Sequence, residues 1–307
     1  MNTFSNIGYT NYYLPKTKIK IEEIVSKIAS SANEYDHIKE SIQLRIGTEF
    51  IYKEKRENEY NIYKDLLTEY LNKKSIDANS IDYLFYTNTM EANEDIVYAL
   101  HQEFKFVNAN IMSIAQGCSG VLASIKVADA LIKNNTAKNI LILANSFLED
   151  DRKRYLAPAI ISDGLGIMEV TEKKGEFEII DYCAFTNGSI NENTFKTEGT
   201  PVRVIKNGSN LILKLLKNNN HGINDISRIL PVNTNIEAYE YYSNFLNCEI
   251  GKIFLDNIPK GGHFGNVDAI RNITDTLNSN IYKKDDLIVL YAVSIGTQWS
   301  AILLKKT

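Results

Sequence analysis

LLTEYLNKKSIDANSIDYLFYTNT, residues 66–89, decides the fold because it recurs without a gap as LILKLLKNNNHGINDISRILPVNT, residues 211–234. Each copy has an amphipathic run, a polar loop and a short apolar run, a pattern that predicts a helix, a loop and a strand. Ile81 of the first copy lies over Ile226 of the second. Self-similarity over a helix and a strand predicts a duplicated α/β unit.

Two later apolar runs fit the same architecture. KNILILANS, which begins at Lys138, and DLIVLYAVS, which begins at Asp286, are typical of strands that are buried on both faces of a sheet. We therefore predict an α/β fold with an N-terminal half over residues 1–172 and a C-terminal half over residues 173–307. Two such halves would bring equivalent helix N-termini together at one site.

Composition limits the classes of function. The 307 residues are 44% hydrophobic and 23% charged, with a formal charge of −4 and no basic stripe, which argues against nucleic-acid binding. No apolar run reaches the roughly 18–20 residues of a membrane span, and the N-terminus does not resemble a signal peptide. Cys118, Cys183 and Cys248 are far apart, without a CxxC pair. We expect a cytoplasmic protein with no metal site and no membrane contact.

One cysteine stands where a helix should begin. In IMSIAQGCSGVLASIKVADALI a strand-like stretch leads to Gly117 and Cys118, and an amphipathic helix follows. The positive end of a helix dipole favours a thiolate, so Cys118 is the candidate nucleophile. The second half has GGHFGNVDAIRNITDTL, in which Gly265 and Asn266 open a helix in the same way. The duplication therefore predicts that Cys118 and the Asn266 amide converge on one pocket.

Several motifs together resemble the thiolase superfamily, and within it the β-ketoacyl-acyl carrier protein synthase III branch. QGCSGVLASIKVADALI is similar to the nucleophile motif of that family, and SDGLGIMEV at residues 162–170 is similar to its G-D-G-A-G-A turn. Gly265 and Asn266 lie in the position of its G-N-T-S-A motif, and SIGTQWSAILL resembles its C-terminal strand. The resemblance covers nearly the whole chain. It implies a five-layered αβαβα fold and a homodimer, or a heterodimer with a related synthase.

The resemblance also implies a mechanism. Cys118 would take an acyl group from an acyl-CoA or acyl carrier protein thioester, with no permanently bound cofactor. In the family a malonyl thioester then decarboxylates, and its carbanion attacks the acyl-enzyme. Asn266 would be a hydrogen-bond donor in that step. The backbone amides of Cys118 and of a residue near Gly296 would form the oxyanion hole.

The chain departs from the family at one decisive position. The family histidine lies in a P-H-Q-A-N motif, and Val232 occupies its place here. Valine can neither donate a hydrogen bond nor move a proton, and losing one such donor costs about 10²–10³-fold where it has been measured. Val232 and Asn233 are candidates for the substrate pocket. Two residues could replace the histidine: His263, three residues before Asn266, as a base, and Asn233 as a donor but not as a base. The alternative for His263 is a loop histidine with a structural role.

Two charged segments carry weaker signals. The family docks its acidic carrier protein with basic residues that follow P-H-Q-A-N, whereas IEAYEYYSNFL here offers Glu237 and Glu240 but no lysine or arginine. DDRKR at residues 150–154 is predicted to be a solvated turn.

Three functions stay open from the sequence. The first is a synthase III-like acyltransferase that forms an acyl-enzyme on Cys118 for fatty-acid-like or specialised biosynthesis. The second is a catalytically impaired subunit that completes a heterodimeric synthase. The third is a cysteine thioesterase or hydrolase with Cys118, His263 and Asn266 as its triad.

Overall fold

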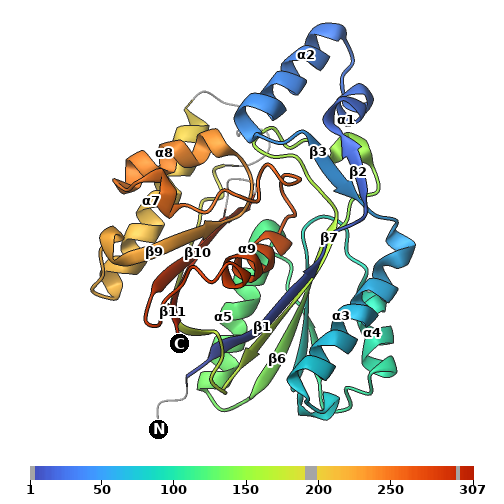
Figure 1. The fold of residues 1–307 in the computed structure, drawn as a ribbon, viewed down its shortest axis with the longest axis vertical. Coiled ribbons are helices and arrows are strands. Elements are labelled where there is room, and N and C mark those ends of the chain that lie inside the picture. Colours follow the sequence, from blue (N-terminus) through green and yellow to red (C-terminus); the bar gives the residue numbers. More distant parts are fainter. Residues whose placement is uncertain (1–3, 191–198, 295–297) are drawn as a thin grey trace.

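The computed structural model describes residues 4–190, 199–294 and 298–307, as drawn in Figure 1. Within those residues the central feature is a nine-stranded sheet with the strand order β5-β4-β6-β7-β1-β8-β11-β10-β9. The strands of its first part are β1 (Asn6–Tyr13), β4 (Tyr83–Asn88), β5 (Asn110–Ser113), β6 (Asn139–Ser146) and β7 (Gly164–Thr171). Those of its second part are β8 (Phe177–Thr186), β9 (Ile226–Pro231), β10 (Leu287–Ser294) and β11 (Gln298–Lys306).

The two parts of the sheet repeat one topology. β4 is parallel to β6, which is antiparallel to β7, which is antiparallel to β1. In the same way β9 is parallel to β10, which is antiparallel to β11, which is antiparallel to β8. Nearly every residue of β6 and β10 is buried, which confirms the prediction that both strands are covered on both faces.

The repeated segments have the same local structure. The helix α3 (Glu59–Lys74), a 3₁₀ turn at Ala78–Ser80 and β4 correspond to α7 (Thr200–Asn218), a 3₁₀ turn at Ile223–Asp225 and β9. Ile81 and Ile226 each follow the turn directly, and both are buried. The boundary between residues 172 and 173 falls in the connection from β7 to β8 and stays a prediction.

Two helices lie between the half-sheets. β1 and β8 pair only through Asn6 with Glu178 and Ile7 with Phe177, and the half-sheets diverge from that point. The space between them holds α5 (Gly120–Lys133) and α9 (Val267–Asn278), as Figure 1 shows. Side chains of both helices and of both half-sheets form one apolar cluster.

The outer faces of the sheet are covered by two further helix layers. α3 and α4 (Glu94–Glu103) pack on the first half-sheet, and α7 and α8 (Ile236–Leu246) pack on the second. The resulting order of helix, sheet, helix, sheet, helix confirms the predicted five-layered αβαβα fold. No helix within the described residues is long and apolar enough to cross a membrane.

A small subdomain extends from the first half. β2 (Thr17–Lys20) and β3 (Phe50–Lys53) form a two-stranded antiparallel sheet, and α1 (Ile21–Ile28), α2 (Ala32–Glu40) and a π-helix at Ser41–Ile46 connect them. Ile51 faces the apolar cluster of these helices. Successive side chains of a strand alternate between faces, so the opposite face of this two-stranded sheet, called the β2–β3 hairpin below despite its long connection, carries Lys18, Lys20, Phe50 and Tyr52.

The connection from β6 to β7 contains a buried cation. The Arg154 guanidinium is wholly buried, donates from both Nη atoms to Asp163 at 2.9 and 3.0 Å, and donates from Nε to Asp151 at 2.8 Å. Arg152, two residues earlier, is exposed and pairs with Asp150. The prediction of a solvated turn is therefore right for Arg152 and wrong for Arg154, because two buried carboxylates draw Arg154 inward.

Replacing Arg154 with methionine should lower the free energy of unfolding by about 3–5 kcal/mol, because it leaves Asp163 buried without its cation. Urea denaturation followed by circular dichroism measures the change. Arg152→Met is the matched control and should change the stability by less than about 0.5 kcal/mol, since that side chain is exposed. Equal losses for the two variants would contradict the assignment of Arg154 as the structural residue.

Candidate active site

Cys118 stands at the start of α5, as the sequence predicts. It lies in a 3₁₀ turn at Gly117–Ser119 that runs directly into the helix, and its side chain is buried. Gly117 has a φ of 49°, and a Cβ there would lie 2.7 Å from the Ser294 hydroxyl, so only glycine fits before the cysteine. The helix N-terminus then directs its positive dipole end at the sulfur region.

His263 is the imidazole that reaches the cysteine. Its Nε2 lies 3.1 Å from Cys118 Sγ, and its side chain is 1% exposed. Backbone hydrogen bonds hold its loop in place, since His263 N donates to Ile160 O and Ser162 N donates to His263 O. The structure therefore brings together two of the predicted site residues from opposite halves of the chain.

A carboxylate, that of Asp268, lies on the side of the His263 ring opposite Cys118. His263 Nδ1 is hydrogen-bonded to Asp268 Oδ2, and Asp268 lies in the first turn of α9. Asn233 donates to this carboxylate from its backbone N at 2.7 Å and from Nδ2 at 2.8 Å, and Phe264 N donates at 3.0 Å. Four hydrogen bonds thus fix a fully buried carboxylate, and it in turn orients the ring so that Nε2 faces the sulfur.

The protonation of His263 follows from its two neighbours. Burial lowers its pKa, but the negative charges of Cys118 and Asp268 outweigh that effect and raise the pKa to about 10. At neutral pH this value describes an imidazolium that lies between the Cys118 sulfur and the Asp268 carboxylate. A sulfur beside a protonated imidazole can supply a nucleophile and, on the neighbouring nitrogen, a proton for a leaving group.

Asn266 opens α9 as Cys118 opens α5. Its backbone N donates to Thr89 Oγ1 at 2.7 Å, and its Nδ2 donates to Thr87 Oγ1 at 3.2 Å. The residue before it, Gly265, has a φ of 56°, which matches the left-handed Gly117 before the cysteine. The buried Oδ1 of Asn266 has no hydrogen-bond partner among the described residues. Whether Asn266 acts as a donor in catalysis stays a prediction.

The remaining predicted site residues have distinct places. Val232 is 1% exposed and belongs to the same apolar cluster as α5 and α9. Asn233 is fully buried, and its side-chain amide donates a hydrogen bond to Asp268, so it supports that carboxylate. Their role in a substrate pocket stays a prediction. Gly296 lies outside the described residues, so the oxyanion hole that the sequence predicts from it and the Cys118 amide stays a prediction.

Sequence reasoning missed Asp268. A signal was present: the family motif G-N-T-S-A reads G-N-V-D-A here, and the acidic residue appears five positions after a histidine that the family motif does not include. Relative to the family motifs, the chain has Val232 in place of a histidine and has His263 and Asp268 where the motifs have neither a histidine nor a carboxylate. These three differences belong together. No motif on a single segment shows that set.

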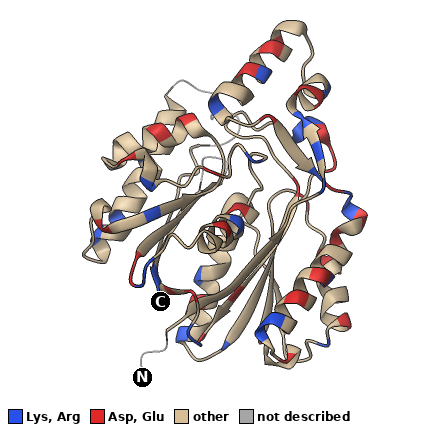
Figure 2. Cartoon of the chain, viewed as in Figure 1, with Lys and Arg blue, Asp and Glu red and all other residues tan. Residues whose placement is uncertain are grey.

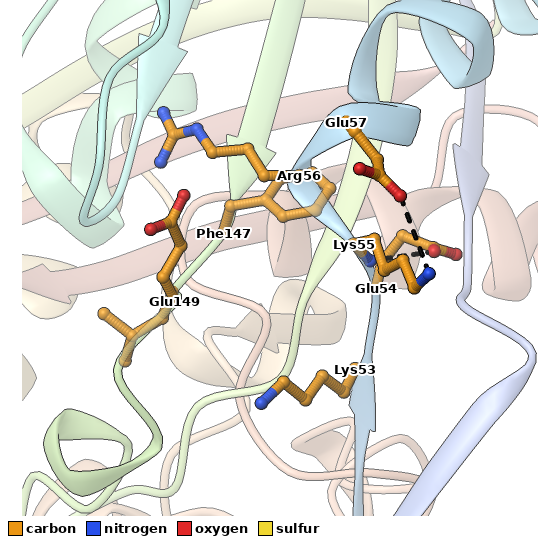
Figure 3. A pocket seen from close by; sticks show the side chains of 8 residues that line it. Lys53, Glu54, Lys55, Arg56, Glu57, Phe147 and Glu149 are labelled. Carbon is orange, nitrogen blue, oxygen red and sulfur yellow. Dashed lines mark hydrogen bonds and ion pairs between the residues drawn. The ribbon is translucent and has the colours of Figure 1, made fainter.

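A separate pocket lies on the surface of the first half. It has a volume of about 470 Å³ and is lined by charged side chains over an apolar floor, as Figure 3 shows; the lining is Lys53, Glu54, Lys55, Arg56, Glu57, Phe147, Leu148 and Glu149. Lys53 is paired with Asp151, and Arg56 with Glu91. None of the three residues Cys118, His263 and Asp268 lines it. Over the parts of the chain that the structure describes, no cluster of histidine, cysteine and carboxylate side chains could hold a metal ion.

Comparisons with known proteins agree with the fold. No family model matches the chain. Two curated relatives, the β-ketoacyl-acyl carrier protein synthases III of Clostridium perfringens and (as synthase III 2) of Staphylococcus epidermidis, are each 23% identical to it. Their alignments cover 97% and 100% of this chain and 98% and 100% of the relatives.

Solved structures share the whole fold. The synthase III of Aquifex aeolicus superposes with a TM-score of 0.82 at 20% identity, covering 98% of this chain and 99% of that one. OleA of Xanthomonas campestris superposes with a TM-score of 0.84 at 10% identity, covering 99% and 98%. The resemblance read from the four motifs is thus confirmed: along nearly its whole length the chain is similar to β-ketoacyl-acyl carrier protein synthases III, and it shares their thiolase-like fold.

Proposed function

We propose that the protein is an acyltransferase that forms an acyl-enzyme on Cys118 and passes the acyl group to a hydroxyl or amine acceptor. The observation that carries the proposal is the contact of 3.1 Å between His263 Nε2 and Cys118 Sγ, with Asp268 behind the imidazole. An acyl-CoA or an acyl carrier protein thioester would be the donor, as the names of the relatives suggest.

The loading step balances on these residues alone. The Cys118 thiolate attacks the thioester carbonyl, the bond from the carbonyl carbon to the donor sulfur breaks, and the leaving thiolate takes the proton from His263 Nε2. Acylation removes the negative charge of Cys118, which is the larger of the two charges that raise the pKa of His263. The imidazole is then neutral and becomes a base.

The transfer step uses the same nitrogen. The acceptor's hydroxyl or amine attacks the acyl carbonyl while His263 Nε2 takes the proton, and the bond from the acyl carbon to Cys118 Sγ breaks. The thiolate and the imidazolium are restored. A triad of nucleophile, imidazole and carboxylate serves this chemistry on several unrelated folds.

Decarboxylation of a malonyl thioester has less support. It needs donors on the enolate oxygen, and Val232 supplies none at the position of the family histidine. His263 is engaged by the sulfur on one nitrogen and by Asp268 on the other. The contacts between Cys118, His263 and Asp268 weaken the hypothesis of a catalytically impaired subunit. If water were the acceptor, the same steps would make the protein a hydrolase.

Intact-protein mass spectrometry tests the proposal. Incubation with acetyl-CoA should add one acetyl group, which Cys118→Ala abolishes and Cys183→Ala leaves in place. The loaded protein should lose the group faster with a panel of amines and alcohols than in buffer, and malonyl-CoA should decarboxylate at a rate at least about tenfold below acyl transfer. If the acetyl group were lost in buffer as fast as with amines and alcohols, the hydrolase hypothesis would be favoured. Rapid decarboxylation of malonyl-CoA would instead favour the condensing reaction of the relatives.

A further inference from the structure

Three lysines along β2 form no salt bridge within the part of the chain that the structure describes. Lys18 and Lys20 lie on one face of β2, and Lys16 precedes that strand; we call these three the lysine row. All three side chains are exposed, and none forms an ion pair with any residue that the structure describes. Figure 2 shows basic residues in blue along β2 and β3, whose basic residues are all lysines, in a chain whose net charge is −4. Lys20 is close enough to Glu22 to attract it electrostatically, but no salt bridge to a described residue fixes any of the three side chains, so their charges face solvent.

The aromatic rings beneath the row are already covered. Lys18 Nζ lies 4.3 Å from the centroid of the Phe50 ring and 5.4 Å from that of Tyr52. A nucleotide base would have to displace this ammonium in order to stack, because a cation–π contact occupies the ring face. At about 3.3 Å per residue, β2 spans roughly 13 Å. An extended row of this length matches the acidic surface of a protein better than it matches a single phosphate group.

The helix where the family carries its basic residues has the opposite charge here. α8 carries Glu237 and Glu240 and no lysine or arginine. Glu237 pairs only loosely with Arg45, at 3.6 Å, and Tyr241 is half exposed. Like charges repel at an interface, so an acidic partner would be disfavoured on α8 and favoured on the lysine row.

The row belongs to a segment that is tied to the catalytic loop. Tyr52 N donates to Ser162 Oγ at 2.8 Å, and Ser162 N donates to the carbonyl of His263. The Tyr52 ring lies 5.7 Å from the ring of Phe264, the residue after His263. A protein docked on the hairpin would therefore rest on the same framework that positions the base.

We propose that the lysine row is the docking surface for an acidic acyl carrier protein that delivers the acyl group to Cys118. The inference rests on the proposed function and adds the partner and its place on the fold. The long-range attraction of the row would act on the association rate and would weaken with salt.

Two triple variants with the same change of charge test the proposal. Lys16, Lys18 and Lys20 are changed to glutamate in one, and the exposed α7 residues Lys206, Lys214 and Lys217 in the other. Each is given the acetylated acyl carrier protein of Clostridium perfringens or acetyl-CoA as donor, and the rate of Cys118 acetylation is followed by mass spectrometry. Carrier binding is measured separately by titration at low and high salt, on unloaded protein.

The hairpin variant should raise the KM for the carrier donor at least about tenfold, weaken carrier binding equally, and leave the KM for acetyl-CoA unchanged. The α7 variant should leave all three measurements unchanged. A loss confined to the α7 variant, equal losses in both, or an equal loss with acetyl-CoA would overturn the inference. If no donor acetylates Cys118, the proposed function fails, and carrier binding still decides the docking surface. Glutamine replacements at the same positions serve if the glutamate variant does not fold.

Discussion

Replacing His263 with alanine should lower the rate of acyl transfer by about 10²–10⁴-fold, the usual contribution of a positioned general base. It is the only imidazole that the described structure places in contact with Cys118, at 3.1 Å. Both steps should slow, because in the proposed mechanism the same nitrogen protonates the leaving thiolate and then deprotonates the acceptor. Single-turnover kinetics on acetylated and on unloaded protein measure the two steps separately.

His221→Ala is the matched control for this variant. His221 is partly exposed and lies 3.8 Å from Asp225, away from the cysteine, so its loss should leave both rates unchanged. If His263→Ala kept the wild-type rate of transfer to an amine, the acceptor would have to arrive already deprotonated. The imidazole would then have no role as a base.

Replacing Asp268 with asparagine should be nearly as damaging to the reaction. The corresponding change in a serine protease lowers kcat about 10⁴-fold, because the ring takes the wrong tautomer. Here the amide would also oppose the donors Asn233 and Phe264, so the stability should fall as well. Asp275→Asn on the same helix is the control, since that side chain is partly exposed and bonds to Tyr12.

A pH profile separates the catalytic effect of Asp268 from the structural one. The pKa of His263 is about 10 in the folded protein and near 6.5 when unfolded, so its proton stabilises the fold fully below about pH 6.5. That stability is lost as the pH rises through about 10. Without the Asp268 charge, the stability that the His263 proton contributes should be lost at a lower pH. Urea denaturation across pH 6–11 measures this loss. An unchanged profile together with reduced activity would assign Asp268 a purely steric role.

The layers of the fold could be read from the sequence because they depend on short-range patterns. The apolar runs at β6 and β10 and the repeat around Ile81 and Ile226 report burial that each segment shows by itself. Cys118 and Asn266 could be found in the same way, since glycine in a left-handed conformation before a helix leaves a visible signature. The candidacy of His263 followed from its closeness to Asn266 along the chain.

What the sequence could not give is the contact between segments. Asp268 reads as an ordinary acidic residue in the first turn of a helix, a position that favours acids for reasons unrelated to catalysis. Arg154 reads as one of three cations in a polar turn, and only the folded structure shows the two carboxylates that bury it. Such roles depend on pairs brought together by the fold, and no local pattern encodes them.

The division of the site between the two halves has a consequence during synthesis. Cys118 leaves the ribosome long before His263 and Asp268, which belong to the helix and loop near the C-terminus. A nascent chain that ends before this region therefore carries a thiol with neither its proton partner nor the carboxylate behind it. The row of Cys118, His263 and Asp268 forms only after α9 docks against the first half, so an incomplete chain would lack the imidazole and the carboxylate on which the proposed acyl transfer depends.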